Sequence, residues 1–574
     1  MLEYFTSGVE KTKNSTLCID ILMSTPMLSW IIWVLKQFLN IFFAIFAKVN
    51  EKRAVCKNGK VVWPAEFSFW RMYKDKEVKS NNTSGEYGRV VKFLALLGGA
   101  QGFSLLINLL RNKVASKLMG TVGIGLIGLY NRTVQMFCDC TNLSLSYSAV
   151  RKLSDVYENS NAEEVVHYVK VTRSIALLTG IAGMLLFMIF SPLVMEFFAD
   201  GGDYSSWYFV LLSPVILFMA VSGGEVAVMR GVRRLNSLAV YTLWNSLAAL
   251  IVALPFYFFM GVDGILPSML FVAFLQMLGA LFHTTRLYSY KAAPFSVRLL
   301  RDGVEMLKLG AGYIYTTILV SFSIWLIYSR IYALGGESEL GLFSAGYLLM
   351  SMLPSVLFAA LDSEYYPRLA GSFGNKKVRN AMVNEQVEVH LLVQTPVILA
   401  VIVVLPLLFP LLYSGKFIPA VEMTQLAIFG LLFHILTYPI SFMPLSKGDI
   451  IVFMSQETVY NVLNVVFAVT GYRYWGLEGV GAGLMFARLM DFVVAFSISY
   501  FRYGFRLSSC SLRYAFVNML IALTVFIAVF CLDGVMYWVC SLPIVAVSVA
   551  FSLYCLVRHG DIFNKLLKRI KLKR

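Results

Sequence analysis

After Lys92 the chain consists of fourteen apolar runs of about 20 residues each, joined by short polar gaps. A helix needs about 20 mainly apolar residues to cross a bilayer, and lipid leaves helices and closed barrels as the spanning structures. Because these runs show no two-residue alternation, we predict helices rather than barrel strands. The predicted fold class is all-α, a polytopic membrane protein with about fourteen transmembrane helices. The runs cover residues 93–112, 121–147, 174–198, 206–229, 237–260, 264–284, 309–331, 341–366, 388–413, 420–446, 450–471, 476–501, 514–532 and 536–557.

Lys and Arg are unevenly divided between alternate gaps. From the first run on, one set of gaps together with the C-terminal tail holds 27 of them, and the other set holds 6. Basic residues stay on the cytoplasmic side of a membrane, so the first run is predicted to start inside and the C-terminus to be cytoplasmic. The formal charge of +16 is then an orientation signal, and no nucleic-acid partner is expected.

An internal repeat divides the runs into two halves. A shift of 216 residues places Lys92 on Lys308, Gly125 on Gly341 and Leu153 on Leu369 without a gap. Two such repeats are typical of transporters with a substrate site between two lobes. The predicted domains are an N-terminal extension (1–89), an N-lobe of six helices (90–290), an amphipathic linker (291–308), a C-lobe of six helices (309–501), two further helices (502–557) and a basic cytoplasmic tail (558–574).

The residues before Met72 do not take part in the repeat. Met27 to Val49 is apolar, but it carries Lys36 and Asn40 in its middle, which is costly for a membrane span. Two interpretations stay open. The segment is an interfacial helix, or translation naturally starts at Met72.

Polar side chains form a stripe along each of the first two runs. Each stripe has spacings of three, four and three residues, which place its members on one helix face. The stripes are Gln101, Ser104, Asn108 and Arg111 in the first run, and Arg132, Gln135, Asp139 and Asn142 in the second. Such residues either bond neighbouring helices or line a water-filled pathway. Two successive stripes with an arginine in each favour the pathway.

The second half carries a counterpart. Glu457, Asn461 and Asn464 share one face of the eleventh run, and Arg488 and Asp491 lie near the middle of the twelfth. Three residues apart on a helix, Arg488 and Asp491 can pair with each other, so a purely structural ion pair stays open as an interpretation.

Three further acids lie at helix ends. Asp362 and Glu364 end the eighth run close to Arg368, and Glu225 follows two glycines at the matching end of the fourth. These acids are either solvated helix ends or parts of a gate.

Several of these features resemble one superfamily. Two repeats of six helices, two further helices and the sequence Asp362-Ser-Glu-Tyr-Tyr-Pro-Arg-Leu369 resemble the multidrug, oligosaccharidyl-lipid and polysaccharide exporters. Within that superfamily the chain looks most like the O-antigen and polysaccharide flippases. The stretch from Gly98 to Met136, with Leu110-Arg-Asn-Lys113 and Tyr130-Asn-Arg132, also resembles the opening of the lipid II flippases. The resemblance covers residues 90–557.

The resemblance implies roles for two arginines. Arg111 and Arg132 take the places of two arginines that line the cationic cavity of the lipid II flippases. Asn112 stands where those flippases have an acid, and the eighth run lacks their arginine. These departures favour another polyprenyl-diphosphate-linked glycan over lipid II. A guanidinium suits a diphosphate because it stays protonated and binds phosphate oxygens in a bidentate fork.

The expected function is therefore the flipping of a polyprenyl-diphosphate-linked oligosaccharide, such as an O-antigen, capsule or exopolysaccharide repeat unit, across the bacterial inner membrane by alternating access. The candidate substrate-binding residues are Arg111, Arg132, Asn108, Gln135, Asp139, Glu457, Asn461 and Arg488, and the candidate gating or coupling residues are Glu225, Asp362, Glu364 and Asp491. The implied partners are the lipid-linked glycan, the membrane, a polysaccharide polymerase and glycosyltransferases. No enzymatic activity, cofactor or metal is expected, because no nucleophile triad, metal-ligand cluster or phosphate-binding glycine loop is recognisable.

Two other functions stay open. A cation-coupled multidrug antiporter would share the fold, but such relatives couple through carboxylates inside the lobes, and the first run contains no Asp or Glu. A membrane-embedded glycosyltransferase or polymerase needs a sizeable outer loop, and gaps such as Gly261–Gly264 are too short for one.

Overall fold

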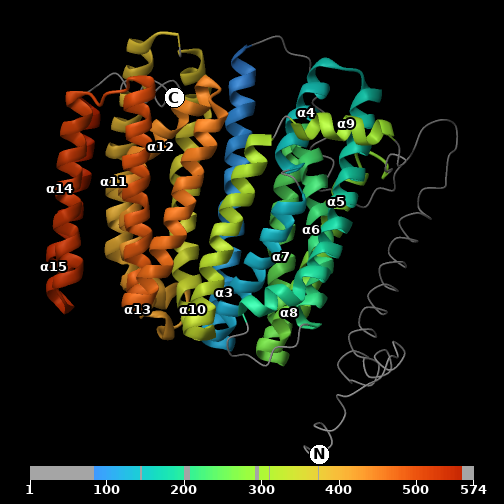
Figure 1. The fold of residues 1–574 in the computed structure, drawn as a ribbon, viewed down its shortest axis with the longest axis horizontal. Coiled ribbons are helices and arrows are strands. Elements are labelled where there is room, and N and C mark those ends of the chain that lie inside the picture. The colour runs from blue at the N-terminus through green and yellow to red at the C-terminus, as the bar shows by residue number, and fades with distance from the viewer. Residues whose placement is uncertain are drawn as a thin grey trace, which may run out of the picture. The chain divides into compact units, whose positions relative to one another are not determined.

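The computed structural model describes residues 83–558, apart from short gaps at 143–144, 199–206, 291–296, 309–310 and 373. The apolar segment from Met27 to Val49, the alternative start at Met72 and nearly all of the basic tail lie outside the described residues. Within the described ranges every regular element is a helix (Figure 1). The helices are α3 (Thr83–Thr141), α4 (Leu145–Asn159), α5 (Ala162–Phe198), α6 (Trp207–Gly231), α7 (Leu235–Met260), α8 (Ile265–Thr285), α9 (Val297–Lys308), α10 (Ala311–Gly371), α11 (Lys376–Leu412), α12 (Ala420–Lys447), α13 (Ile450–Tyr503), α14 (Ser509–Cys531) and α15 (Gly534–Arg558).

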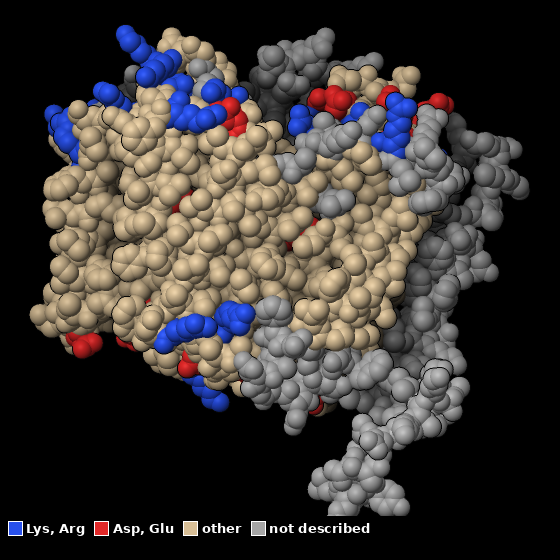
Figure 2. Space-filling view, in the orientation of Figure 1, with Lys and Arg blue, Asp and Glu red and all other residues tan. Residues whose placement is uncertain are grey.

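These helices are those of a multi-pass membrane protein. Nine helical stretches among the described residues are long and apolar enough to cross a bilayer. In Figure 2 the Lys and Arg side chains gather toward two edges of the surface in view, and the broad area between those edges carries few charges. The predicted all-α polytopic fold is confirmed, and the exact number of fourteen spans stays a prediction.

Three of the helices are broken where the sequence predicts turns between runs. The backbone leaves the helical region at Gly120 in α3, at Gly336 in α10 and at Gly476 in α13, with φ of 67°, 74° and 58°. Positive φ is open to glycine because it has no Cβ. In α10 the break reverses the chain, since the rings of Tyr328 and Phe343 lie only 5.0 Å apart. Along a straight helix these residues would be about 22 Å apart.

The breaks follow the internal repeat. Gly120 and Gly336 are related by the same shift of 216 residues that relates Gly125 to Gly341. Gly125 and Gly341 also meet in space, because a Cβ added to Gly125 would lie 2.8 Å from the backbone nitrogen of Gly341. Equivalent residues of two repeats can touch only near the axis that relates the repeats. This contact supports a two-lobed arrangement, while the domain boundaries themselves stay predictions.

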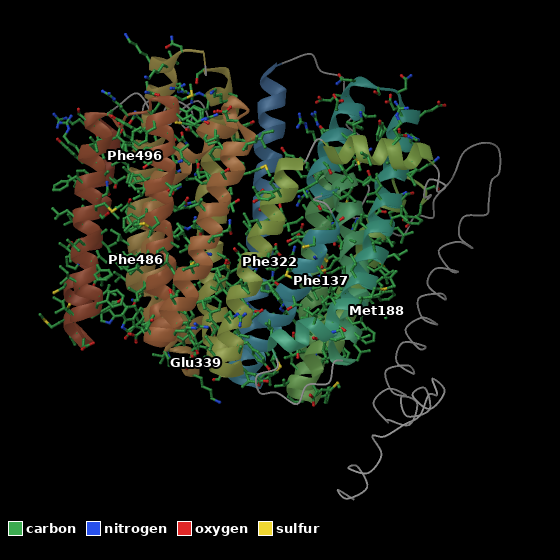
Figure 3. The ribbon with its side chains drawn as sticks, viewed as in Figure 1. Phe137, Met188, Phe322, Glu339, Phe486 and Phe496 are labelled. Carbon is green, nitrogen blue, oxygen red and sulfur yellow. The ribbon has the colours of Figure 1, made fainter. Side chains whose placement is uncertain are left out.

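The breaks of α3, α10 and α13 lie at one end of the helices. Thr121 Oγ1 and Ser338 Oγ are 2.7 Å apart, which joins the break of α3 to that of α10. The Tyr472 hydroxyl donates to Glu339, which joins the break of α13 to that of α10. Figure 3 shows Glu339 at this end and Phe496 toward the opposite end of the bundle. We refer to this end as the hinge end.

The amphipathic segment that the sequence predicts between the lobes forms helix α9. Leu299 and Met306 on its apolar face are buried in a cluster with residues of α4, α5 and α6. His167 Nε2 of α5 lies 2.8 Å from Asp302 Oδ2 of α9. The apolar face of α9 therefore packs against the first lobe instead of lying open toward lipid.

Candidate substrate site

The glycine breaks divide α3, α10 and α13 into two arms each, a first arm before the break and a second arm after it. Arg132 lies on the second arm of α3, where that arm meets α10. Its guanidinium carbon is 5.3 Å from the ring centroid of Tyr347 and 5.6 Å from that of Tyr328, one tyrosine on each arm of α10. A cation over an aromatic face is attracted by the negative face of the ring. No carboxylate of the described residues forms an ion pair with Arg132. The tyrosines thus hold the guanidinium in place without neutralising its charge.

Asp139, on the same stripe, has partners of its own. Its carboxylate accepts hydrogen bonds from Gln135 Nε2 at 2.9 Å and from the Ser321 hydroxyl of α10. Asp139 follows Arg132 by seven residues on the same helix, which corresponds to about 10 Å along the helix axis. This geometry favours hydrogen bonding between helices, the alternative to a pathway role, for Asp139, while Gln135 bonds Asp139 within the same helix.

The stripe of the first arm of α3 is divided between several environments. Gln101 is exposed, whereas Asn108 and Arg111 are half-buried. Ser104 bonds to the Ser246 hydroxyl of α7, so this member joins two helices of one lobe. The structure therefore does not gather the four residues around one point.

A neighbouring lysine links the two lobes. Lys113 Nζ donates to the backbone carbonyls of Pro410 and Tyr413 at the C-terminal end of α11. A cation is stabilised there by the unpaired carbonyls and the negative end of the helix dipole. This contact gives Lys113 a role in positioning the two lobes.

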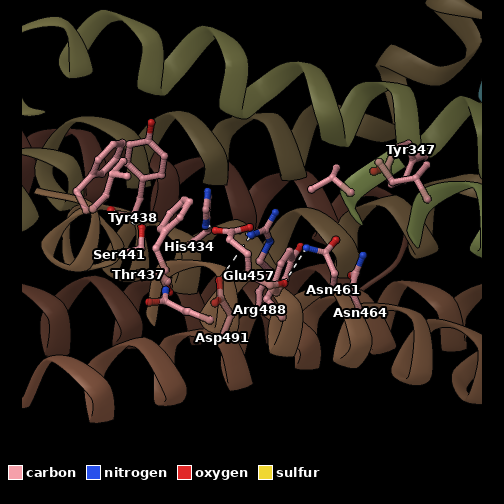
Figure 4. Close-up of a pocket in the computed structure, with 17 residues that line it drawn as sticks. Tyr347, His434, Thr437, Tyr438, Ser441, Glu457, Asn461, Asn464, Arg488 and Asp491 are labelled. Atoms are coloured by element: carbon pink, nitrogen blue, oxygen red, sulfur yellow. Dashed lines mark hydrogen bonds and ion pairs between the residues drawn. The ribbon is translucent and has the colours of Figure 1, made fainter. Parts of the chain in front are cut away.

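The predicted residues of the second half surround a cavity of about 330 Å³ between α10, α12 and α13. Glu457, Asn461, Arg488 and Asp491 all line it (Figure 4), as does Asn464. The two arms of α13 supply these side chains because the break at Gly476 folds one arm against the other. We refer to this space as the C-lobe cavity.

Arg488 is the most constrained group of the C-lobe cavity. Its Nη1 lies 3.2 Å from His434 Nδ1 and 3.7 Å from Asp491 Oδ2. Its guanidinium carbon lies 4.4 Å from the ring centroid of Tyr460. Arg488 Nε is buried without a hydrogen-bond partner. The predicted pairing with Asp491 exists, and it leaves one buried donor unused.

Sequence reasoning missed His434 and the tyrosines around the two arginines. His434 reaches Arg488 from α12, 54 residues earlier in the chain. Tyr347 contacts Arg132 and also lines the C-lobe cavity, so it stands between the two arginines. Helical periodicity reports only which residues share a face of one helix, so no signal in the sequence pointed to these contacts.

Glu225, a candidate gating residue, forms a buried ion pair. Arg173 Nε and Nη2 bind its two carboxylate oxygens at 2.8 and 3.1 Å, and both side chains are 1% exposed. Arg173 also donates to the carbonyl of Ser289 at 2.9 Å. The pair joins α5, α6 and the segment after α8. Of the other gating candidates, Asp491 lines the C-lobe cavity, and the side chains of Asp362 and Glu364 are not among those the structure describes.

The sequence comparisons point to one family. Residues 90–373 match the family described as polysaccharide biosynthesis protein. The predicted relationship to the exporter superfamily is confirmed. No functionally curated protein matches the chain.

Solved structures share the fold at low identity. A lipid II flippase, MurJ, in an inward closed conformation is 13% identical with a TM-score of 0.62, covering 81% of this chain and 99% of that one. An inward-facing multidrug resistance MATE family transporter of the MOP superfamily is 15% identical with a TM-score of 0.57, covering 70% and 94%. A MATE protein in complex with MaL6 is 14% identical with a TM-score of 0.51, covering 72% and 96%. At these identities the likeness concerns the fold.

Proposed function

We propose that this protein flips a polyprenyl-diphosphate-linked oligosaccharide across the bacterial inner membrane by alternating access. Arg132 carries the proposal. It lies within the helical bundle, where its guanidinium lies over the rings of Tyr328 and Tyr347. It forms no ion pair with a described carboxylate. An uncompensated guanidinium at membrane depth costs several kcal/mol and by default marks a substrate pathway. A diphosphate supplies the missing negative charge.

The chemistry of the substrate fits this position. The head group carries two phosphates and a polar glycan, and the tail is apolar. A guanidinium binds phosphate oxygens through two parallel hydrogen bonds and keeps its charge at every physiological pH. The match of residues 90–373 to polysaccharide biosynthesis proteins favours a glycan as the cargo.

The packing at the hinge end suits alternating access. There the second arms of α3 and α10 approach closely at Gly125 and Gly341, and Lys113 reaches the end of α11. We infer that these contacts close one end of a path between the lobes. Charge distribution predicts that this end faces outward, so closing it would leave Arg132 open to substrate from the cytoplasm. A polymerase and glycosyltransferases are the proposed partners in the same membrane.

The proposal is tested with the full chain in proteoliposomes loaded with a fluorescent undecaprenyl-diphosphate-linked oligosaccharide. Flipping is measured as exposure of the glycan to a glycosidase outside the vesicles. Arg132→Ala should abolish flipping, and Arg132→Lys should restore it only in part, because a lysine lacks the bidentate fork. The matched control is Arg473→Ala, which removes an exposed arginine of α13 and should flip normally.

Two results would end the proposal. One is flipping by Arg132→Ala at the wild-type rate with equal amounts of protein inserted. The other is wild-type protein that moves a lipophilic cationic dye against a proton or sodium gradient and leaves the lipid-linked glycan in place. The second result would establish the multidrug antiporter, the alternative that the structural likeness to MATE transporters favours.

A further inference from the structure

We propose that the C-lobe cavity holds the first sugar of the lipid-linked glycan and selects a sugar without a carboxylate, either neutral or amino-bearing. The inference rests on the proposed function, since it assumes that the diphosphate binds at Arg132. It goes further by assigning a separate subsite to the sugar and by stating which class of sugar fits.

The charge of the C-lobe cavity argues against a second phosphate or an acidic sugar. Glu457 and Asp491 place two carboxylates around a single guanidinium, that of Arg488 (Figure 4). Arg488 is already engaged by Asp491 and by the ring nitrogen of His434. An anion entering this space would lie beside two acidic side chains in a weakly screened interior and would find no guanidinium without an acid partner. Arg132, in contrast, forms no ion pair with a described carboxylate.

The lining of the C-lobe cavity suits a sugar ring. Its aromatic side chains offer apolar faces for the C–H groups of a pyranose, and its amides and carboxylates offer partners for hydroxyl groups. The aromatic group includes Tyr347 and Tyr460, and the polar group includes Gln456, Asn461 and Asn464 beside the charged residues. A cavity of about 330 Å³ is at the lower end of ligand-pocket sizes, which suits one sugar and not a whole repeat unit.

An unused donor points to an occupant. Arg488 Nε is buried without a partner, and leaving a buried donor without a hydrogen bond is unfavourable. A sugar hydroxyl can accept from this nitrogen and donate to Glu457 or Asp491 at the same time, because a hydroxyl is both donor and acceptor. A phosphate or carboxylate cannot donate to these acids.

The two subsites are neighbours. Tyr347 contacts the Arg132 guanidinium at 5.3 Å on one side and lines the C-lobe cavity on the other. In a lipid-linked glycan the first sugar is bonded directly to the diphosphate. A diphosphate at Arg132 and a sugar beyond Tyr347 therefore match the order of groups in the substrate.

The test measures the affinity of the purified full chain for four short probes. They are farnesyl diphosphate, and the same lipid diphosphate bearing glucose, glucosamine or glucuronic acid. The wild type should bind the glucose and glucosamine probes at least tenfold more tightly than farnesyl diphosphate, and the glucuronic acid probe no more tightly. Asn464→Leu should remove the gain from glucose and leave the affinity for farnesyl diphosphate unchanged, which also shows that the variant is folded.

A charge-neutralising variant tests the selectivity. Glu457→Gln keeps the shape of the side chain and removes one negative charge, so it should raise the affinity for the glucuronic acid probe about tenfold relative to the glucose probe. The inference is overturned if glucose adds no affinity, if Asn464→Leu leaves the gain intact, or if wild type prefers glucuronic acid. Arg132→Ala tests the proposed function separately, because it should lower the affinity for farnesyl diphosphate itself.

Discussion

Three arginines within the bundle illustrate how one residue type takes three roles. Arg173 is neutralised by a bidentate carboxylate, and Arg488 is shared between an acid and a histidine. Arg132 lies over two tyrosine rings and forms no salt bridge with a described carboxylate. The free energy of burying a guanidinium depends on these partners. Only the arginine without an acid partner is left for an anionic ligand.

The Arg173–Glu225 pair is predicted to be structural. Glu225→Ala should lower the free energy of unfolding by about 3–5 kcal/mol, because it leaves a buried charge uncompensated. The double variant Arg173→Met with Glu225→Leu should recover most of this loss, since both charges are removed together. Thermal unfolding in detergent, with flipping measured in parallel, checks both. If Glu225→Ala retains its stability and loses only flipping, the original gating hypothesis is correct.

Arg132 and Asp139 are predicted to act independently. Asp139 accepts hydrogen bonds from Gln135 and Ser321 and forms no salt bridge with Arg132, so we expect its role to be separate from substrate binding. The double variant Arg132→Leu with Asp139→Leu should therefore fold and stay inactive in glycan flipping. Recovery of flipping in this double variant, with Arg132→Leu alone inactive, would show that the two charges form a structural pair instead.

At the scale of elements, the second arms of α3 and α10 close against each other through glycines. A Cβ on Gly341 would lie 1.9 Å from the carbonyl oxygen of Thr121, and backbone cannot yield as a flexible side chain does. The packing of these two arms is therefore incompatible with any larger residue at this position.

Gly341→Ala is predicted to hold the two arms apart at the hinge end. A cysteine introduced at the buried Ser344 should then react faster with N-ethylmaleimide than in the parent chain. The matched control is Gly102→Ala on the first arm of α3, where a Cβ meets no atom within 4 Å. That variant should leave the labelling rate unchanged and add slightly to helix stability. Equal labelling rates in both variants would refute the role of the glycine contact.

At the scale of the whole molecule, transport by alternating access requires the lobes to separate at the hinge end. Thr121 and Ser338 lie on different lobes, and their hydroxyls are 2.7 Å apart. Cysteines at these positions, in a chain whose eight native cysteines are replaced, are close enough to form a disulfide.

Oxidation of the pair Thr121→Cys with Ser338→Cys should stop flipping, and reduction should restore it. The matched control is Ser104→Cys with Ser246→Cys, which replaces a similar hydroxyl contact within the first lobe. That disulfide should leave flipping unchanged, because no relative motion of its two helices is required. Continued flipping with the first pair fully oxidised, measured by the loss of free thiols, would contradict rocking of the lobes.

The sequence by itself determined the elements of this protein. A chain in lipid must satisfy its backbone within helices, so the length of an apolar run and the glycines between runs define where helices start, break and end. Gly120 and Gly336 lie in two of the predicted gaps, and Gly476 is the first residue of the predicted twelfth run. The polar residues of the eleventh and twelfth runs do meet around one cavity.

Only the tertiary structure decided which polar groups are partners. The contacting residues are far apart in the sequence. Glu225 pairs with Arg173, 52 residues away, and Asp139 accepts from Ser321, 182 residues away. Arg488 lies beside His434, 54 residues away. Periodicity is a property of one helix, and it states which face a side chain occupies without stating which helix covers that face. The helix packing therefore determined that Glu225 is neutralised, that Asp139 joins two helices and that Arg132 lies against Tyr328 and Tyr347.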